Sequence, residues 1–299
     1  MVKLSRQSGQ KHGGGIWRRG LALAFAALAL AACSTLSTGY NNAPTLLTWW
    51  ADSYFDLDGG QEDLLKDRLR ALRAWHRTQL PDYARAFGEV QLRLNRTVQP
   101  EDVAWLYAES TKRMRRLAEH AAPDAALIAT RLRAGNLEAL RRKLEKNNAE
   151  FEDDYVNAAA GKRADKRYER VLKEAERWYG SFDREQKKQI RVLTARLPTD
   201  LAPVLADRKR RQAELLGILE DASAQRAPTE EIARRLLRWT DYERGRTPEF
   251  QAYAQAYRRE AERVFAAIAN LATPEQRETA IKNVGDYMEQ FNALAVAGN

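Results

Sequence analysis

The chain has 299 residues, of which 50 are Lys or Arg and 41 are Asp or Glu, so its net charge at pH 7 is +9. Its composition is 44% hydrophobic and 9% aromatic, which is typical of a globular protein and excludes an intrinsically disordered one. The chain contains one cysteine, so it has no disulfide framework of its own.

The first 32 residues are expected to form a secretory signal peptide. Residues 1–20 contain five basic and no acidic side chains, and an apolar run follows over residues 21–32. A charged region before an apolar run that is too short to cross a bilayer is typical of such a signal. An ordinary signal peptide with an incidental Cys33, or an uncleaved membrane helix, are the alternatives.

The run ends in Leu30-Ala31-Ala32-Cys33, which resembles the bacterial lipobox. That resemblance implies that Cys33 is acylated and becomes the first residue of the mature protein, with membrane lipid as its partner. Several acyl chains give a stable anchor. The next residue is Ser34 rather than Asp, and by resemblance to the sorting rule of Gram-negative lipoproteins this implies the outer membrane, with the body facing the periplasm.

The charge balance changes when the signal is removed. Its five cations leave with it, so that 45 basic and 41 acidic residues remain, a net charge of +4. Basic clusters recur along the mature chain, but acidic residues lie among them at helical spacing, which is typical of a solvated helix surface. Export also argues against nucleic acid as a partner.

We expect residues 33–44 to be a lipidated tether and residues 45–299 a single helical domain, with a candidate hinge at residues 158–163. Trp49 and Trp50 begin the most aromatic segment of the chain. Their near-helical spacing to other apolar residues favours a role in sealing one end of a helical core. The alternative is that they lie in the lipid headgroup layer.

From residue 58 onward, amphipathic stretches follow one another with almost no strand-like alternation, which predicts an all-α fold, an elongated antiparallel bundle of about ten helices. Most prolines, including Pro123, fall between the apolar stripes and are expected to mark helix boundaries. Two of these stripes are Val103, Leu106, Ser110, Met114 and Leu117, and the seven-residue series Leu137, Leu144, Phe151 and Ala158.

A short pattern precedes three of the predicted helices, namely Asp58 with Gln61, Asp183 with Gln186, and Thr273 with Gln276. An Asp or Thr three residues before Gln predicts a capping box, in which the two side chains bond each other's backbone N–H. The pattern also resembles the Leu-Thr-x-x-Gln motif of small helical periplasmic chaperones of the Spy and CpxP type. That resemblance implies a chaperone or stress-response protein that binds unfolded clients.

The mature chain also resembles a family of proteobacterial lipoproteins that carry a domain of unknown function. The residues that carry the resemblance are Tyr40-Asn41, Leu47, Trp50, Tyr54, Asp56-Leu57 and Gln61. It implies a lipid-anchored helical protein and assigns no catalytic residue.

The sequence offers little for catalysis, and we expect no enzyme, no metal site and no cofactor. His76 and His120 lie on different predicted helices, whereas a zinc site needs three or four ligands. We expect His76 at the edge of an apolar stripe and His120 in the last turn of its helix. A carboxylate site at Glu150, Glu152, Asp153 and Asp154 is the enzymatic alternative. Asn147 and Asn148 are expected to make buried polar contacts.

The run Arg208-Lys209-Arg210-Arg211 is the basic segment most specific for a partner, because four consecutive cations must point to all sides of a helix. Membrane headgroups or another anionic envelope lipid would suit it. Together these features predict a non-enzymatic, membrane-anchored periplasmic lipoprotein that binds an envelope protein or lipid or has a structural role there.

Overall fold

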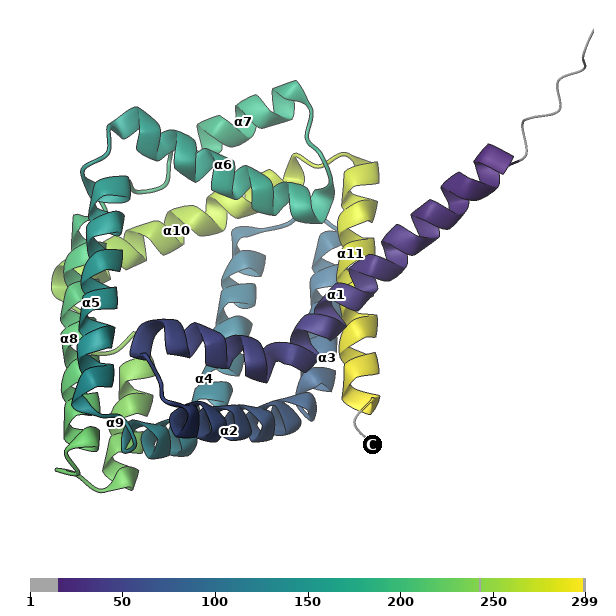
Figure 1. Cartoon of the computed structure of the whole chain (residues 1–299). Coiled ribbons are helices and arrows are strands. Elements are labelled where there is room, and N and C mark those ends of the chain that lie inside the picture. The colour runs from purple at the N-terminus through teal and green to yellow at the C-terminus, as the bar shows by residue number, and fades with distance from the viewer. Residues whose placement is uncertain (1–15, 242, 298–299) are drawn as a thin grey trace, which may run out of the picture. The chain divides into compact units, whose positions relative to one another are not determined.

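The structure is a computed structural model that describes the backbone of residues 16–241 and 243–297, and side chains from residue 36 onward. Over these residues the secondary structure is helical throughout, with eleven α-helices, one π-helix and no strand (Figure 1). The expectation of an all-α helical bundle is therefore confirmed. The chain divides into two compact units, Met1–Asn42 and Ala43–Asn299. The second unit is called the body below.

The helices follow one another with short connections. Their bounds are α1 Ile16–Phe55, α2 Gly59–Arg77, α3 Leu80–Leu94, α4 Pro100–Ala129, α5 Ala134–Phe151, η1 Glu152–Val156, α6 Ala160–Tyr179, α7 Arg184–Thr194, α8 Ala202–Ser223, α9 Thr229–Thr240, α10 Pro248–Asn270 and α11 Pro274–Val296.

Helix α1 includes residues 33–44, the segment predicted to be a tether, and it also contains Pro44. A proline inside a helix leaves one carbonyl without its usual N–H partner. That carbonyl lies one turn before the proline. In a separate contact one turn after it, the buried Thr48 hydroxyl donates to the Pro44 carbonyl at 2.8 Å. The boundary between the two units falls just before this proline. None of the helices described has enough apolar length to cross a membrane.

Helices α3 and α11, far apart in the sequence, lie side by side in the body (Figure 1). They run antiparallel, because Tyr83 meets Phe291 at one end while Arg277 donates to the Leu94 carbonyl at the other. Gly285 of α11 leaves room for the end of the Gln91 side chain of α3. A Cβ added at Gly285 would lie 2.9 Å from Nε2 of Gln91. An aromatic seam that includes Phe87 joins this pair and reaches α6 through Trp178 and Tyr287.

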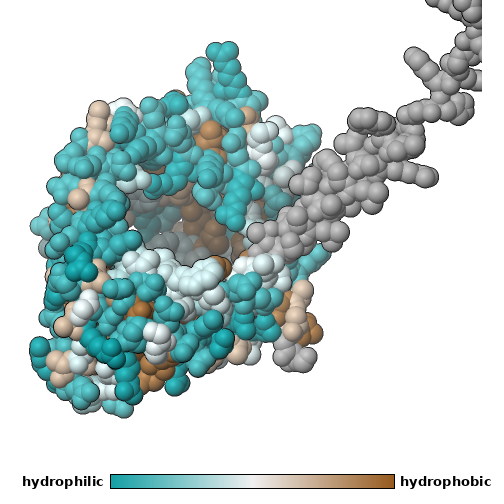
Figure 2. Space-filling model, in the orientation of Figure 1, coloured by the Kyte–Doolittle hydropathy of each residue, from teal (hydrophilic) through white to brown (hydrophobic). Residues whose placement is uncertain are grey.

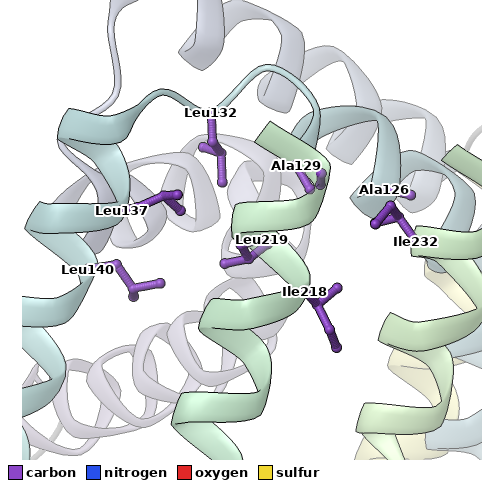
Figure 3. Packing of buried hydrophobic residues seen from close by; sticks show 9 residues of the cluster. Ala126, Ala129, Leu132, Leu137, Leu140, Ile218, Leu219 and Ile232 are labelled. Atoms are coloured by element: carbon purple, nitrogen blue, oxygen red, sulfur yellow. The ribbon is translucent and has the colours of Figure 1, made fainter. Parts of the chain in front are cut away.

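The remaining helices of the body also pack on one another. Helix α4 packs on α2, α9 and α10, helix α8 on α5, α9 and α10, and α6 on α7 and α11. The buried apolar side chains form three separate clusters. The largest joins α4, α5, α8 and α9, and its side chains point toward one another in Figure 3. A second joins α6, α7 and α10, and a small third one surrounds Val98.

Two predicted helix boundaries are wrong. The seven-residue series from Leu137 to Ala158 does not form one helix, because α5 ends at Phe151, a π-helical turn follows, and α6 begins at Ala160. The candidate hinge at residues 158–163 thus overlaps a break between two helices. Conversely, α4 continues through Pro123 to Ala129, so His120 lies well before its last turn.

The three predicted capping boxes are confirmed at the starts of α2, α7 and α11. In each, the side chain of Asp58, Asp183 or Thr273 accepts a hydrogen bond from the backbone N–H of the glutamine three residues later. The glutamine Oε1 in turn accepts from the backbone N–H of the cap residue. Each box satisfies N–H groups that a helix start otherwise leaves unpaired.

The glutamines do more than cap their own helices, because those of α7 and α11 also bond each other. Nε2 of Gln186 donates to Oε1 of Gln276 at 2.8 Å, and the reverse bond is 3.2 Å long. Each Nε2 also donates, at 2.8 Å, to the carbonyl two residues before the partner's cap residue, Leu271 or Ser181. The starts of α7 and α11 are thereby joined by their own capping residues.

The same arrangement joins α2 and α5. Gln61 and Asn136 are both buried and exchange amide hydrogen bonds of 3.0 and 3.2 Å. Gln61 donates to the Arg131 carbonyl and Asn136 to the Asp56 carbonyl, again two residues before each partner's cap residue. Asn136 occupies the third position of α5, where Leu132-Arg133-Ala134-Gly135-Asn136 is a fourth, divergent copy of the pattern.

We expect Gln186→Leu, or Gln276→Leu, to lower the free energy of unfolding by about 1–3 kcal/mol, because either change leaves backbone and amide groups of the cluster without partners. Urea denaturation measures the effect. The matched control is Gln251→Leu on the exposed side of α10, which is expected to stay within about 0.5 kcal/mol of the parent. Equal stabilities for all three variants would contradict a structural role for the glutamine pair.

Candidate functional site

Cys33, the predicted acylation site, belongs to α1, but its side chain lies outside the described residues. Its lipidation therefore stays a prediction. The residues that follow it up to position 51 carry no charged side chain, in a chain of which 30% is charged.

The expectation that Trp49 and Trp50 seal a core is wrong. Both side chains lie at the surface of the body, with exposed fractions of 64% and 59%. The segment anchors itself through its following aromatic residues instead, since Tyr54 and Phe55 pack against the cluster of α4, α5, α8 and α9. The Tyr54 hydroxyl also accepts a hydrogen bond from Asn147 at 3.1 Å.

Arg208, Lys209, Arg210 and Arg211 each have contacts within the body. The Arg208 guanidinium lies 5.3 Å from the centre of the Phe151 ring, and Lys209 pairs with Glu152 at 3.0 Å. Arg210 pairs with Asp207 at 3.3 Å and Glu214 at 3.6 Å. Arg211 is buried over the Trp239 ring. These contacts account for the four cations without an external partner, and their role in binding stays a prediction.

Asp207, the residue before this run, is the most deeply buried acid of the described residues, with 1% of its surface exposed. It forms an ion pair with Arg246, whose side chain is also buried. Burial and the nearby Arg246 guanidinium lower the pKa of Arg211. A buried pair of this kind fixes the loop after α9 onto α8, because separating the charges would leave each without compensation.

The four acidic residues near the end of α5 do not converge on a site. Glu150, Asp153 and Asp154 are exposed, and Asp154 pairs with Lys166 at 2.6 Å. That hydrogen bond lowers the pKa of the Asp154 carboxyl. Among the described residues, no group of three or more His, Cys, Asp or Glu side chains is placed to hold a metal ion. The carboxylates thus give the enzymatic alternative no structural support.

The two histidines contact aromatic rings. His120 stacks on Trp75, with ring centres 3.8 Å apart, and His76 lies 3.2 Å from the Tyr83 hydroxyl. Burial lowers the pKa of His76. The expected buried polar contact of Asn148 is confirmed, because it exchanges hydrogen bonds of 2.6 and 3.2 Å with Gln212.

The apolar stripe of α4 is exposed over part of its length, against the expectation that it packs into the core. Leu106 and Ser110 lie at the surface, and Met114 is 66% exposed. Helix α4 instead packs through alanines on another side, of which Ala122, Ala126 and Ala129 are buried. Small side chains allow neighbouring helices to approach closely. The alanine side of α4 therefore packs against other helices, and the larger residues of the stripe stay at the surface.

The same alanine-rich side borders an open cavity of about 500 Å³, called here the α4–α10 cavity. Three small residues at helical spacing along α4 leave room for the cavity: Ala104, Ala108 and Thr111. The remaining lining residues come from α4, α10 and the loop after α9: Tyr107, Lys112, Arg115, Arg116, Glu119, Glu243, Arg258 and Glu262. A volume of this size is ordinary for a small-molecule or peptide site.

The charged groups of the cavity are partly fixed by one another. The Arg258 guanidinium lies 4.4 Å from the centre of the Tyr107 ring and donates to its hydroxyl at 3.1 Å. Arg258 also pairs with Glu243 at 3.3 Å. Lys112 has no carboxylate within 4.0 Å among the described residues. The wall can therefore offer both charge signs and an aromatic face to a polar ligand.

Sequence reasoning placed Lys112, Arg115, Arg116 and Arg258 among solvated basic clusters and did not predict the cavity. The available signal was the row of small residues at positions 104, 108 and 111, which share one side of α4 with Arg115.

The space-filling view also shows one face of the body hollowed at its centre, with hydrophobic side chains in its depth and a mainly hydrophilic surface around it (Figure 2).

We expect Asp207→Asn to lower the free energy of unfolding by about 3–5 kcal/mol, because Arg246 stays buried after its charged partner is removed. Thermal or urea denaturation measures the change. Asp165→Asn is the matched control, since Asp165 forms an exposed ion pair with Arg191, and its removal should cost no more than about 1 kcal/mol. Similar losses in both variants would show that burial of the Asp207 pair is not decisive.

Comparison with known proteins gives one finding. A family model described as a family of unknown function (DUF6279) matches residues 53–244, more than half of the chain. The matched stretch runs from the end of α1 to the loop after α9, so α10 and α11 lie outside it. No curated protein and no solved structure matches the chain. The chain therefore belongs to the DUF6279 family of unknown function.

Proposed function

We propose that this protein is a non-enzymatic, lipid-anchored binding protein of the cell envelope. Acylated Cys33 holds it in the outer membrane with the body facing the periplasm, and the α4–α10 cavity takes an envelope component. The observation that carries the binding role is this cavity, in which four cations, three acids and an aromatic ring line about 500 Å³.

The anchor is supported by the sequence around the cysteine. A charged segment, a short apolar run and small residues directly before Cys33 together favour lipoprotein processing over an ordinary signal peptide. An exported protein with a single free thiol would otherwise carry a reactive group at its surface. Acylation removes that reactivity and accounts for the presence of one cysteine.

A chaperone-like role is the second candidate, and the exposed side of α4 favours it. Leu106, Tyr107 and Met114 are exposed large apolar side chains on that helix, next to the cavity. Flexible apolar residues such as methionine adapt to many partners. The capping boxes resemble the chaperone motif, but they serve here to join helices within the body.

Replacement of Cys33 by Ala should release the protein from the membrane fraction or stall its processing, because no thiol remains for acylation. Fractionation of cells, with the mass of the mature N-terminus as a second readout, measures this. Ser34→Ala is the control, which keeps the thiol and should stay in the membrane fraction. Unchanged fractionation and mass in Cys33→Ala would refute the lipid anchor.

A photo-crosslinking residue at Thr111, inside the cavity, should capture a discrete envelope component in intact cells. The same residue at Val192, exposed on α7 away from the cavity, is the matched control and should not capture it. Lys112→Ala together with Arg258→Ala should reduce the yield at Thr111, because the cavity then offers two fewer cations to the ligand. Identical products at both positions would contradict binding in the cavity. Many different products at Met114 would favour the chaperone role.

A further inference from the structure

One side of α1 in the body is apolar and unpartnered. Leu46 and Leu47 are 47% and 46% exposed, and Trp49 and Trp50 are more exposed still. These four residues, called here the Trp49–Trp50 face, share one side of the helix, while Pro44 and Thr48 on the opposite side are buried. Four large apolar side chains exposed within five residues are unusual for a surface in contact with water.

The surroundings of this face are suited to a lipid interface. Residues 34–51 contain no charge that would have to be dehydrated on contact with acyl chains, and tryptophan is favoured at the boundary between headgroups and hydrocarbon. Beyond Trp50 lies Tyr54, whose ring is 4.9 Å from that of Trp50. The Lys143 amine lies 5.3 Å from the Tyr54 ring, so a cation is available near the edge of the face for a lipid phosphate.

The face is also close to the predicted anchor along the chain. Trp49 follows Cys33 by only 16 residues. A lipid-attached cysteine therefore keeps the face within reach of the same bilayer. A soluble partner would have to be recruited, whereas the membrane surface is present at high effective concentration from the moment of acylation.

We propose that the Trp49–Trp50 face docks onto the surface of the phospholipid bilayer, with α1 lying along the interface and the two tryptophan rings at the level of the headgroups. This docking rests on the proposed lipid anchor, and it adds a second contact that orients the body relative to the membrane. An acyl anchor alone does not fix the orientation of the body. Docking of α1 fixes which side of the body faces the periplasm.

Bromolipid quenching of tryptophan fluorescence tests the docking. The acylated protein is reconstituted into vesicles of phosphatidylethanolamine and phosphatidylglycerol, with and without lipids that carry bromine near the top of the acyl chain. Flotation of the vesicles reports the anchor independently. We expect quenching in the wild-type protein and its loss in Trp49→Phe with Trp50→Phe, because Trp75, Trp105, Trp178 and Trp239 are partly buried in the body.

Two further variants separate docking from the mere presence of the fluorophores. Leu46→Ser with Leu47→Ser keeps both tryptophans but weakens the apolar face, and it should reduce the quenching. The control Leu92→Ser removes a leucine of α3 that is 64% exposed, and it should leave the quenching unchanged. All of these side chains are exposed, so thermal unfolding should not change in any variant.

The outcomes distinguish the docking from the anchor. Flotation without quenching would overturn the docking and leave the anchor in place. Quenching of protein that has not been acylated would support the docking alone, and the absence of both signals would overturn both. If the tryptophans become protected from iodide when protein concentration is raised without vesicles, the face belongs to a second copy of the chain and the membrane proposal is overturned.

Discussion

The body depends on four helix starts that meet in pairs. At each pair, two amide side chains each accept a hydrogen bond from the backbone N–H of their own cap residue, bond each other, and donate to the carbonyl two residues before the partner's cap residue. A helix start carries unpaired N–H groups that are costly to bury, so burying two of them together requires that every polar group be satisfied. Gln186 with Gln276, and Gln61 with Asn136, meet this requirement in the same way. The repetition indicates that one local solution is used twice in the chain.

These junctions lie between small apolar clusters and not around one large core. Helices α3 and α11 pack on each other and reach α6 through aromatic contacts, whereas α4, α5, α8 and α9 share a separate apolar cluster. Beside α4, toward α10, the packing leaves a cavity. The row of alanines on α4 contributes both to helix packing and to the cavity. Toward its C-terminal end the alanines allow α9 to approach, and toward its start they border the α4–α10 cavity.

Some basic side chains make contacts within the body, whereas others line the cavity. The basic run at residues 208–211 is held by ring contacts and ion pairs, and its neighbour Asp207 forms a buried pair with Arg246. By contrast, Lys112 and Arg258, which look like ordinary surface cations in the sequence, line the cavity. An exposed apolar face on α1 and a charged cavity on α4 and α10 thus give the body two chemically different surfaces.

Local pattern alone determined the helical class, most helix starts and the capping boxes, because helix periodicity and N-terminal capping involve residues within one or two turns. It failed where a distant partner decides the outcome. Trp49 and Met114 have helical spacing suited to a core, but both side chains are exposed in the part of the chain that the structure describes, and Pro123 is tolerated inside α4. The pairing of Gln61 with Asn136 across 75 residues, the burial of Arg211 and the existence of the cavity follow only from how the helices pack. Periodicity shows which side of a helix is apolar, whereas tertiary packing decides which side is covered.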